Sequence, residues 1–281
     1  MNSVILGSSY IMANTPDMVI HNGTTQTTER TVNPNSEYLK EIKNHLRTFD
    51  QVVGYLPNQA YIGNITPDEL VKYEMPWFDK IKEGASREGK FGEIMPQDEF
   101  IVLMHICDVF DLIKLEKQFT SETKKKLMEH PLFDDSLISR IKDGEDFEVI
   151  KKYVDEEHAE ALYNYGELVG CVKRAHDIDS NLSGHVMLEN LVSKASNVLA
   201  LLNLVSKNNI NKEEIEYVIE CSEEACGDMN QRGGGNFAKA CAEVAGFVNA
   251  TGSDTRGFCA GPTHAIIEAA SLVKAGVFKK V

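Results

Sequence analysis

One cysteine of this sequence stands where a thiol can act as a nucleophile. The residues around Cys259 predict a short buried strand at about 252–257, a tight turn from Gly257 to Gly261, and a helix that ends near Lys274. The thiol would then lie at the start of a helix, where unpaired backbone N–H groups and the positive end of the helix dipole favour an anion. Because the thiolate is the nucleophilic form of cysteine, we expect Cys259 to be the catalytic residue.

Small residues beside this cysteine leave room for an acyl group. Ala260 and Gly261 let a carbonyl group approach the sulfur and the backbone N–H of Cys259. Pro262 suits the first helical turn, where its missing N–H is not needed. We therefore expect Gly257, Ala260 and Gly261 to form the turn and the oxyanion site. The alternative is that Cys259 is a packed, unreactive residue, as most cysteines are.

The order of elements before the cysteine favours the catalytic interpretation. The sequence predicts a helix at 186–206, an apolar strand Ile215–Glu220 and a second helix Asn236–Ala245. This order, followed by a strand, a turn and a cysteine that opens a helix, resembles the N-terminal half of the thiolase-like fold. The ketoacyl synthase III branch of that fold has a nucleophilic cysteine at the start of a buried helix. The resemblance implies an α/β fold with Cys259 as the nucleophile.

Residues that could bind an anionic substrate are fewer and less specific. Gly233 and Gly234 precede a predicted helix and could present N–H groups to an anion, but the Gly-Lys-Ser/Thr ending of a phosphate-binding loop is missing. Arg256 lies near the cysteine, although isolated basic side chains usually belong to solvated surfaces. His264 follows Cys259 by five residues. On one continuous helix the two would be about 140° apart, which makes His264 a poor general base.

Composition excludes several classes of protein. A chain of 281 residues can bury a substantial core, and its net charge of −14 argues against nucleic-acid partners. No basic segment with a following apolar core opens the chain, and no apolar run approaches the roughly 18 residues of a membrane span. The six cysteines form no C-x-x-C pair, so we expect reduced thiols, no metal site and a cytoplasmic location.

The N-terminal region is predicted to begin with extended chain. Ser3–Ala13 has the pattern of a first strand, 18–20 of a second short extended piece, and the polar stretch His21–Arg30 of a loop. Farther on, Thr66 and Glu69 predict a helix start with a capping box, in which each side chain accepts the other residue's backbone N–H.

Residues 85–182 predict a large all-helical insertion. It would begin with a long amphipathic helix at Asp98–Glu116. Shorter helices are expected near 121–130, 135–142, 145–153 and 156–174. We therefore expect one thiolase-like region over 1–281, with first strands at 1–20 and a strand–helix core at 183–281. Because another strand is expected after Gly276, we also expect the chain to be the N-terminal portion of a longer subunit.

Three strings carry a more specific resemblance. Pro16–Pro34, Pro57–Leu70 and Arg256–His264 resemble the beta subunits of component C in glycine/sarcosine/betaine reductase complexes, and the likeness spans nearly the whole chain. In that family, component B activates the amino acid and selenoprotein A takes it as a carboxymethyl selenoether. Component C then forms an acetyl thioester, which phosphate cleaves to acetyl phosphate.

The family resemblance implies the partners and the substrates. The component C alpha subunit and selenoprotein A would be the partners, phosphate would be a substrate, and no cofactor is implied. The alpha subunit also carries a candidate thiol, so either subunit could hold the acetyl group. Two alternatives remain open for the function: a ketoacyl synthase III-like enzyme that condenses acyl thioesters, and a non-catalytic scaffold in which Cys259 is only packed.

Overall fold

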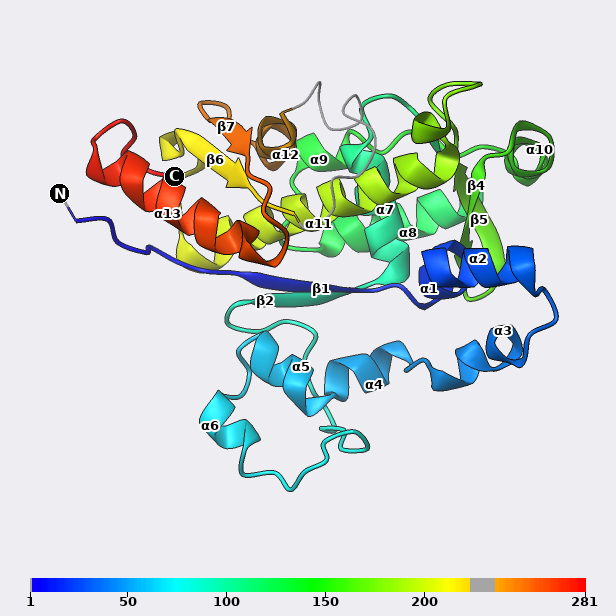
Figure 1. Ribbon diagram of the computed structural model, residues 1–281, viewed down its shortest axis with the longest axis horizontal. Helices are drawn as coiled ribbons and strands as arrows, with labels where there is room; N and C mark the ends of the chain where they lie inside the picture. The colour runs from blue at the N-terminus through cyan, green and yellow to red at the C-terminus, as the bar shows by residue number, and fades with distance from the viewer. Residues whose placement is uncertain (1, 223–235) are drawn as a thin grey trace.

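One long helix runs through the middle of the molecule. The structure is a computed structural model and describes residues 2–222 and 236–281. Helix α11 (Gly184–Asn208) has 25 residues, and the other elements are arranged around it (Figure 1). The mixture of helices with small sheets confirms the expected α/β class, whereas the thiolase-like architecture stays a prediction.

The N-terminal third combines one strand with short helices. In chain order these are β1 (Tyr10–Asn14), α1 (Pro16–Asn22), α2 (Thr24–Val32), α3 (Glu37–Glu41), the 3-10 helix η1 (Ile42–His45), α4 (Phe49–Gly54), α5 (Leu56–Tyr61) and α6 (Pro67–Leu70). The segment from α3 to α6 lies on one side of β1, away from α11 (Figure 1).

The rest of the chain contains both strands and helices. The middle third contains β2 (Gly92–Pro96), α7 (Gln97–Cys107), β3 (Ile113–Leu115), α8 (Lys117–Glu129), α9 (Asp135–Ile138), α10 (Phe147–Glu157), β4 (Glu160–Asn164) and β5 (Glu167–Val172). The last third contains η2 (Ser180–Leu182), α11, η3 (Lys212–Glu214), β6 (Tyr217–Glu220), α12 (Phe237–Ala245), β7 (Thr251–Asp254), η4 (Phe258–Ala260) and α13 (Gly261–Lys274).

The described strands form three small sheets. Strands β1 and β2 are parallel, β3, β5 and β4 form an antiparallel sheet in that order, and β6 and β7 are parallel. The register of the last pair places Glu220 beside Asp254 at the carboxyl ends of both strands. Side chains that follow these two strands are therefore brought to one edge.

Two helices supply much of the apolar core. Every residue of α7 is buried, and Leu191, Val198 and Leu199 of α11 have no exposed surface. Three- and four-residue spacing, which places residues on one face of a helix, joins the buried apolar residues Leu188, Leu191, Ala195, Val198 and Leu202 of α11. This periodicity is why the sequence predicts the helix at 186–206, and the structure confirms it.

The N-terminal expectations are wrong in two places. The strand begins only at Tyr10, and the chain before it exposes Val4, Ile5 and Leu6. The stretch that we predict as extended chain and loop forms helices α1 and α2. Arg30 of α2 donates hydrogen bonds to the carbonyl oxygens of Ile20, at 2.7 Å, and His21. The polar residues therefore stabilise a helix pair through a contact that local periodicity does not reveal.

Residues 85–182 are not all helical, because β2, β3, β4 and β5 lie within them. The predicted helix Asp98–Glu116 ends at Cys107. There the Asp108 carboxylate accepts the N–H groups of Phe110 and Ile113, at 3.0 and 2.8 Å, and turns the chain into β3. The helix expected near 156–174 is the β4–β5 hairpin instead.

The turn of that hairpin has the backbone conformation of a tight β-turn but an unusual sequence. Tyr165 and Gly166 have φ values of 52° and 79°. Two successive residues with positive φ match the tight turn that the twist of antiparallel strands favours. Tyr165 is a rare residue at such a position, so the usual Asn-Gly or Asp-Gly signal is absent from the sequence.

Other local expectations are confirmed. Thr66 and Glu69 form the predicted capping box at the start of α6. The strand before Glu220, the helix at 237–245 and the helix that ends at Lys274 all occur where the sequence predicts them. In the described ranges, no helix is both long enough and apolar enough to cross a membrane.

Candidate active site

Strand β7 is tightly packed against its neighbours before the chain reaches the cysteine. A Cβ atom at Gly252 would lie 2.4 Å from the carbonyl oxygen of Val218 and 2.9 Å from the Cβ of Ala238. The close approach of β6 and α12 therefore requires glycine at this position. Asp254 accepts the backbone N–H groups of Phe237 and Ala238 at 2.9 and 2.8 Å, which fixes the end of β7 to the start of α12.

The helix after the cysteine is fastened to the same strand. Glu268, on α13, accepts hydrogen bonds from Ser253 Oγ at 2.9 Å and from Thr255 Oγ1 at 2.8 Å. Both hydroxyl groups come from β7 or the residue that follows it. The carboxylate thus sets the position of α13 relative to β7, on the far side of the turn that carries Cys259.

Arg256 is held by the buried carboxylate of Glu220, a residue that the sequence pattern does not indicate. Its Nη1 lies 2.5 Å from Oε2 of Glu220, whose side chain is only 2% exposed. The backbone N–H of Thr255 also donates to the carbonyl oxygen of Glu220, at 2.8 Å. Arg256 therefore lies near Cys259 in the chain as predicted, but part of its guanidinium is already occupied by Glu220.

The turn itself contains one unfavourable backbone conformation. Phe258 has φ 48° and its side chain is 76% exposed. Such a left-handed conformation of a bulky residue costs about 1–3 kcal/mol and persists only where the surrounding structure imposes it. Cys259 follows directly, is exposed, and lies in η4 immediately before α13. The structure thus confirms that Cys259 stands at the start of a helix.

The predicted oxyanion residues surround this cysteine in the chain. The N–H of Ala260 donates to the carbonyl oxygen of Gly257 at 3.0 Å, and that of Gly261 donates to Phe258. These two N–H groups are thus bonded within the turn. Their role toward an oxyanion stays a prediction. Gly233 and Gly234 lie outside the described residues.

Two side chains approach the turn from elsewhere. A Cβ atom at Gly257 would lie 3.1 Å from Cδ2 of His264, and one at Gly261 would lie 3.5 Å from Cβ of Cys221. The angle of about 140° around the helix axis between His264 and Cys259 applies only if both lie on one continuous helix. Because Cys259 lies in a 3-10 turn instead, His264 packs against that turn, which the helical geometry does not indicate.

Exposure separates Cys259 from the other described cysteines. Burial raises the pKa of Cys107 and of Cys171 to about 12, and it also raises the pKa of Cys241. Cys221 is half-buried, and its pKa is raised by burial and by the nearby Glu220, against a smaller opposite effect of Arg256. Those four side chains are therefore held as thiols at neutral pH, and Cys259 is the exposed residue among the described cysteines.

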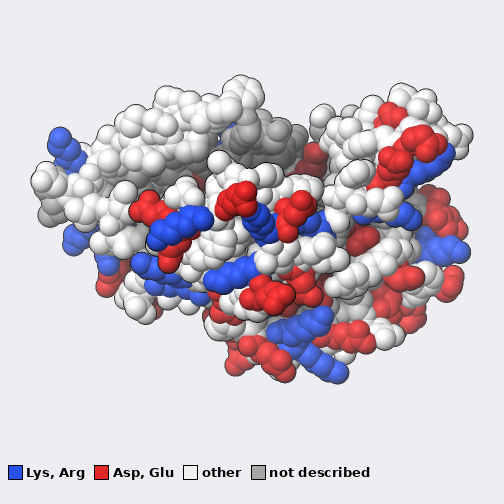
Figure 2. Space-filling model, turned by 90° about the horizontal axis from the view of Figure 1, so that it is seen from below, with Lys and Arg blue, Asp and Glu red and all other residues white. Residues whose placement is uncertain are grey.

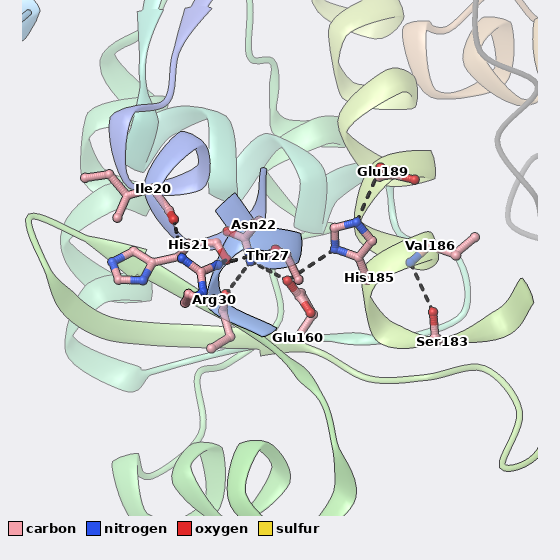
Figure 3. Close-up of polar contacts among 11 residues, drawn as sticks. Ile20, His21, Asn22, Thr27, Arg30, Glu160, Ser183, His185, Val186 and Glu189 are labelled. Carbon is pink, nitrogen blue, oxygen red and sulfur yellow. Dashed lines mark hydrogen bonds and ion pairs between the residues drawn. The ribbon is translucent and has the colours of Figure 1, made fainter. Parts of the chain in front are cut away.

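A second polar cluster joins three distant segments on the other end of the molecule. Asn22 of α1 donates to Glu160 of β4 at 2.7 Å, and His185 of α11 lies 3.3 Å from the same carboxylate (Figure 3). The other ring nitrogen of His185 faces Glu189 at 3.4 Å. Asn22 is buried, and its Oδ1 has no partner among the described residues.

The charges of this cluster support one another. Burial opposes the charged form of Glu160, but hydrogen bonds from His185 and Asn22 outweigh it and lower the pKa of Glu160. The same bond to Glu160 raises the pKa of His185. The cluster therefore works as an ionic link between α1, β4 and α11. The described ranges contain no group of three His, Cys, Asp or Glu side chains placed to hold a metal ion.

The outer side of α13 exposes two large apolar side chains and lies in a region with few charges. Ile266 and Ile267 are 65% and 58% exposed. Charged side chains crowd the lower part of the face in Figure 2, whereas its upper left, the end that α13 occupies in Figure 1, has few. Helix α13 is thus largely uncovered on its outer side, in contrast to the buried helix that a ketoacyl synthase III resemblance implies.

These features define a class: an α/β chain whose exposed cysteine starts a helix beside a parallel strand pair. The chain is 61% identical, over 280 residues and 99% of its length, to the glycine/sarcosine/betaine reductase complex component C subunit beta of Peptoclostridium acidaminophilum. The match covers 54% of that protein, so the chain spans about half the length of this curated relative. The resemblance that the three sequence strings indicate is confirmed. No protein-family model and no solved structure matches the chain.

Proposed function

We propose that this chain belongs to an acetyl-transfer subunit of an amino-acid reductase complex, with Cys259 as the acetyl carrier. The single observation that supports it most is the exposed cysteine at the start of α13, when the other described cysteines are buried or half-buried. The identity of 61% to a subunit of a reductase complex supports a role for this thiol in the reaction of such a complex. The component C alpha subunit and selenoprotein A are the proposed partners, and the cytoplasm is the proposed location.

The chemistry assigned to Cys259 is the formation of an acetyl thioester and its cleavage by phosphate. In forming the acetyl thioester, the Cys259 sulfur bonds to the carboxyl carbon as hydroxide leaves, the carbon–selenium bond breaks, and the methylene carbon takes up a proton. The selenium is oxidised by two electrons in the same process and leaves as a selenenylsulfide with a thiol of the selenoprotein. An oxygen of inorganic phosphate then attacks the carbonyl carbon, the carbon–sulfur bond breaks, and the thiolate leaves as acetyl phosphate forms. Backbone N–H groups near the start of α13 would stabilise the oxyanion of this step, for which Gly257, Ala260 and Gly261 are the candidates. The N–H groups of Ala260 and Gly261 would have to exchange their bonds within the turn for bonds to the oxyanion. Arg256 and, more weakly, Gly233 and Gly234 are the candidates for substrate binding.

The test is substitution of the thiol in the full-length subunit assembled with its partners. We expect Cys259→Ala to abolish acetyl phosphate formation, and Cys221→Ala, a half-buried thiol of the same region, to retain it. Full activity of the Cys259→Ala complex would contradict the proposal and support a scaffold role. Formation of carbon–carbon bonds from malonyl thioesters would instead support a condensing enzyme.

A further inference from the structure

Among the residues that the structure describes, Glu220 binds the segment before the cysteine through both its backbone and its side chain. Its carbonyl oxygen accepts the N–H of Thr255 at 2.8 Å, and its carboxylate contacts Arg256 at 2.5 Å. These two contacted residues directly precede the turn that begins at Gly257 and leads to Cys259. The conformation of that turn is therefore tied to Glu220.

The turn requires such an external restraint. Phe258 holds a left-handed backbone conformation with φ 48°, although its side chain is 76% exposed and has little packing of its own. Strained residues keep their conformation only when their neighbours impose it. Downstream, α13 is fixed by Glu268 through Ser253 and Thr255. Upstream, the contact with Glu220 supplies the matching restraint.

Stability alone does not account for this carboxylate. Glu220 is 4% exposed, and its Oε1 has no hydrogen-bond partner among the described residues. It also lines a cavity of about 80 Å³ together with Asn197, Leu201 and Cys241. A buried charge with one oxygen unsatisfied is costly, and a buried ion pair is often no more stabilising than apolar residues of the same size. The pair is thus better explained by what it orients.

We propose that Glu220 is a positioning residue for Cys259. By holding Arg256, it fixes the backbone at Gly257 and Phe258 and thereby sets where the sulfur lies relative to the N–H groups at the start of α13. This inference rests on the proposed role of Cys259. It assigns to Glu220 no contact with the substrate, so its effect falls on the rate of the chemical step.

Two substitutions distinguish the effect of the position of the Glu220 side-chain oxygen from the effect of its charge. Glu220→Gln removes the charge but keeps an oxygen that can accept from Arg256 at the same place. Glu220→Asp keeps the charge but withdraws it from Arg256 by one methylene. Glu216→Asp is the matched control, because Glu216 directly precedes the same strand and accepts backbone N–H groups from Lys279 and Lys280.

The complex assembled with the full-length subunit is assayed for acetyl phosphate formation at varied phosphate. We expect Glu220→Asp to lower kcat by about tenfold or more, because a small displacement of a reacting group slows the chemical step strongly. Any rise in KM for phosphate, from the displacement of Arg256, should be smaller than this fall in kcat. Glu220→Gln should stay within about threefold of the wild type in kcat, and Glu216→Asp should match it. Loss of kcat in Glu220→Gln, whatever the result for Glu220→Asp, would show that charge matters and would overturn the proposal, and wild-type kcat in both variants would overturn it too. A rise in KM alone would overturn it as well.

A second measurement is independent of activity. Amide hydrogen exchange of the segment 255–262 should accelerate in Glu220→Asp and not in Glu220→Gln, while exchange in α11 stays unchanged. Unchanged exchange at 255–262 in Glu220→Asp would refute the positioning role even if the complex failed to assemble. Because the Cys259→Ala assay decides the proposed function, the two ideas can fail separately.

Discussion

At the scale of single residues, the conformation of Phe258 is the feature most closely linked to the thiol. Phe258 has φ 48° and directly precedes Cys259 in η4, the 3-10 turn before α13. Tyr165, with φ 52°, is a second exposed aromatic residue in the same backbone region. Glycine adopts this region without steric cost. Glycine in place of either aromatic residue should therefore relieve strain while loosening the turn.

Phe258→Gly should separate stability from activity. We expect its free energy of unfolding to stay within about 1 kcal/mol of the wild type, because relief of strain offsets the greater entropy of the unfolded chain. Its kcat in the assembled complex should fall, because the turn before Cys259 gains conformations. Tyr165→Gly should have a similar effect on stability and none on kcat. Equal kcat values for wild type and Phe258→Gly would contradict the importance of this backbone conformation.

His105 makes the stability of the protein depend on pH. Burial lowers its pKa to about 4 from 6.5, against the smaller opposite effect of Asp108. As the pH falls from 6.5 toward 4, the unfolded chain takes a proton on this side chain and the folded chain does not. Stability should therefore fall over this interval, by about 2 kcal/mol at pH 5.

His105→Leu should remove this dependence. Urea unfolding at pH 7 and pH 5 should show a smaller difference in the free energy of unfolding for His105→Leu than for the wild type, by about 2 kcal/mol. His176→Leu, at an exposed position, serves as the control and should keep the wild-type difference. A wild-type difference in His105→Leu would show that His105 is not buried in its neutral form.

At the scale of elements, the link between β4 and α11 should act within a limited pH range. The lowered pKa of Glu160 means that its contribution is present above its unfolded value of 4.5 and is lost as the pH falls through the lower folded value. The raised pKa of His185 means that its contribution is complete below 6.5 and is lost as the pH rises through the higher folded value. Both are present between these limits.

A double-mutant cycle with Glu160→Gln and His185→Gln measures this link. We expect a coupling free energy of about 1 kcal/mol at pH 5.5 and a smaller one at pH 9, since neutral imidazole no longer pairs with the carboxylate. The exposed pair Lys117–Asp146, whose side chains are 61% and 71% exposed, should show almost no coupling. A Glu160–His185 coupling that does not change with pH would contradict an ionic link.

The same scale shows which elements the sequence could predict. Helix α11 and the capping box at Thr66 are encoded by residues within a few positions of one another, and both are confirmed. The β4–β5 hairpin was missed because its turn uses Tyr165 where asparagine or aspartate is usual. Helix α2 was missed because Arg30 stabilises it by capping α1, which is a tertiary contact.

At the scale of the whole molecule, stability should reside around α7 and α11 and not around the outer face of α13. Leu199 is fully buried, whereas Ile266 is 65% exposed. Leu199→Ala should lower the free energy of unfolding by about 2–5 kcal/mol, and Ile266→Ala by less than about 0.5 kcal/mol. Chemical denaturation of the two variants measures both values. A large loss in Ile266→Ala would mean that α13 is packed more tightly than its exposure indicates.

The parts of the candidate site that depend on neighbouring residues could be predicted from the sequence, and those that depend on strand order could not. The start of the helix at Cys259 follows from a glycine-bounded turn and an apolar helix beside it, so the sequence places it correctly. Glu220 precedes its partner Arg256 by 36 residues, and only the parallel pairing of β6 with β7 brings them together. Residues of that kind cannot be found without the strand order, which single-sequence patterns do not specify.

The central claim is that Cys259 carries the acetyl group. The most direct measurement is mass mapping of the assembled complex after turnover without phosphate and an acid quench, which preserves thioesters. We expect a peptide with the mass of one added acetyl group at Cys259, which phosphate removes on addition. An acetyl group found on the partner subunit alone, with Cys259 unmodified, would contradict the account.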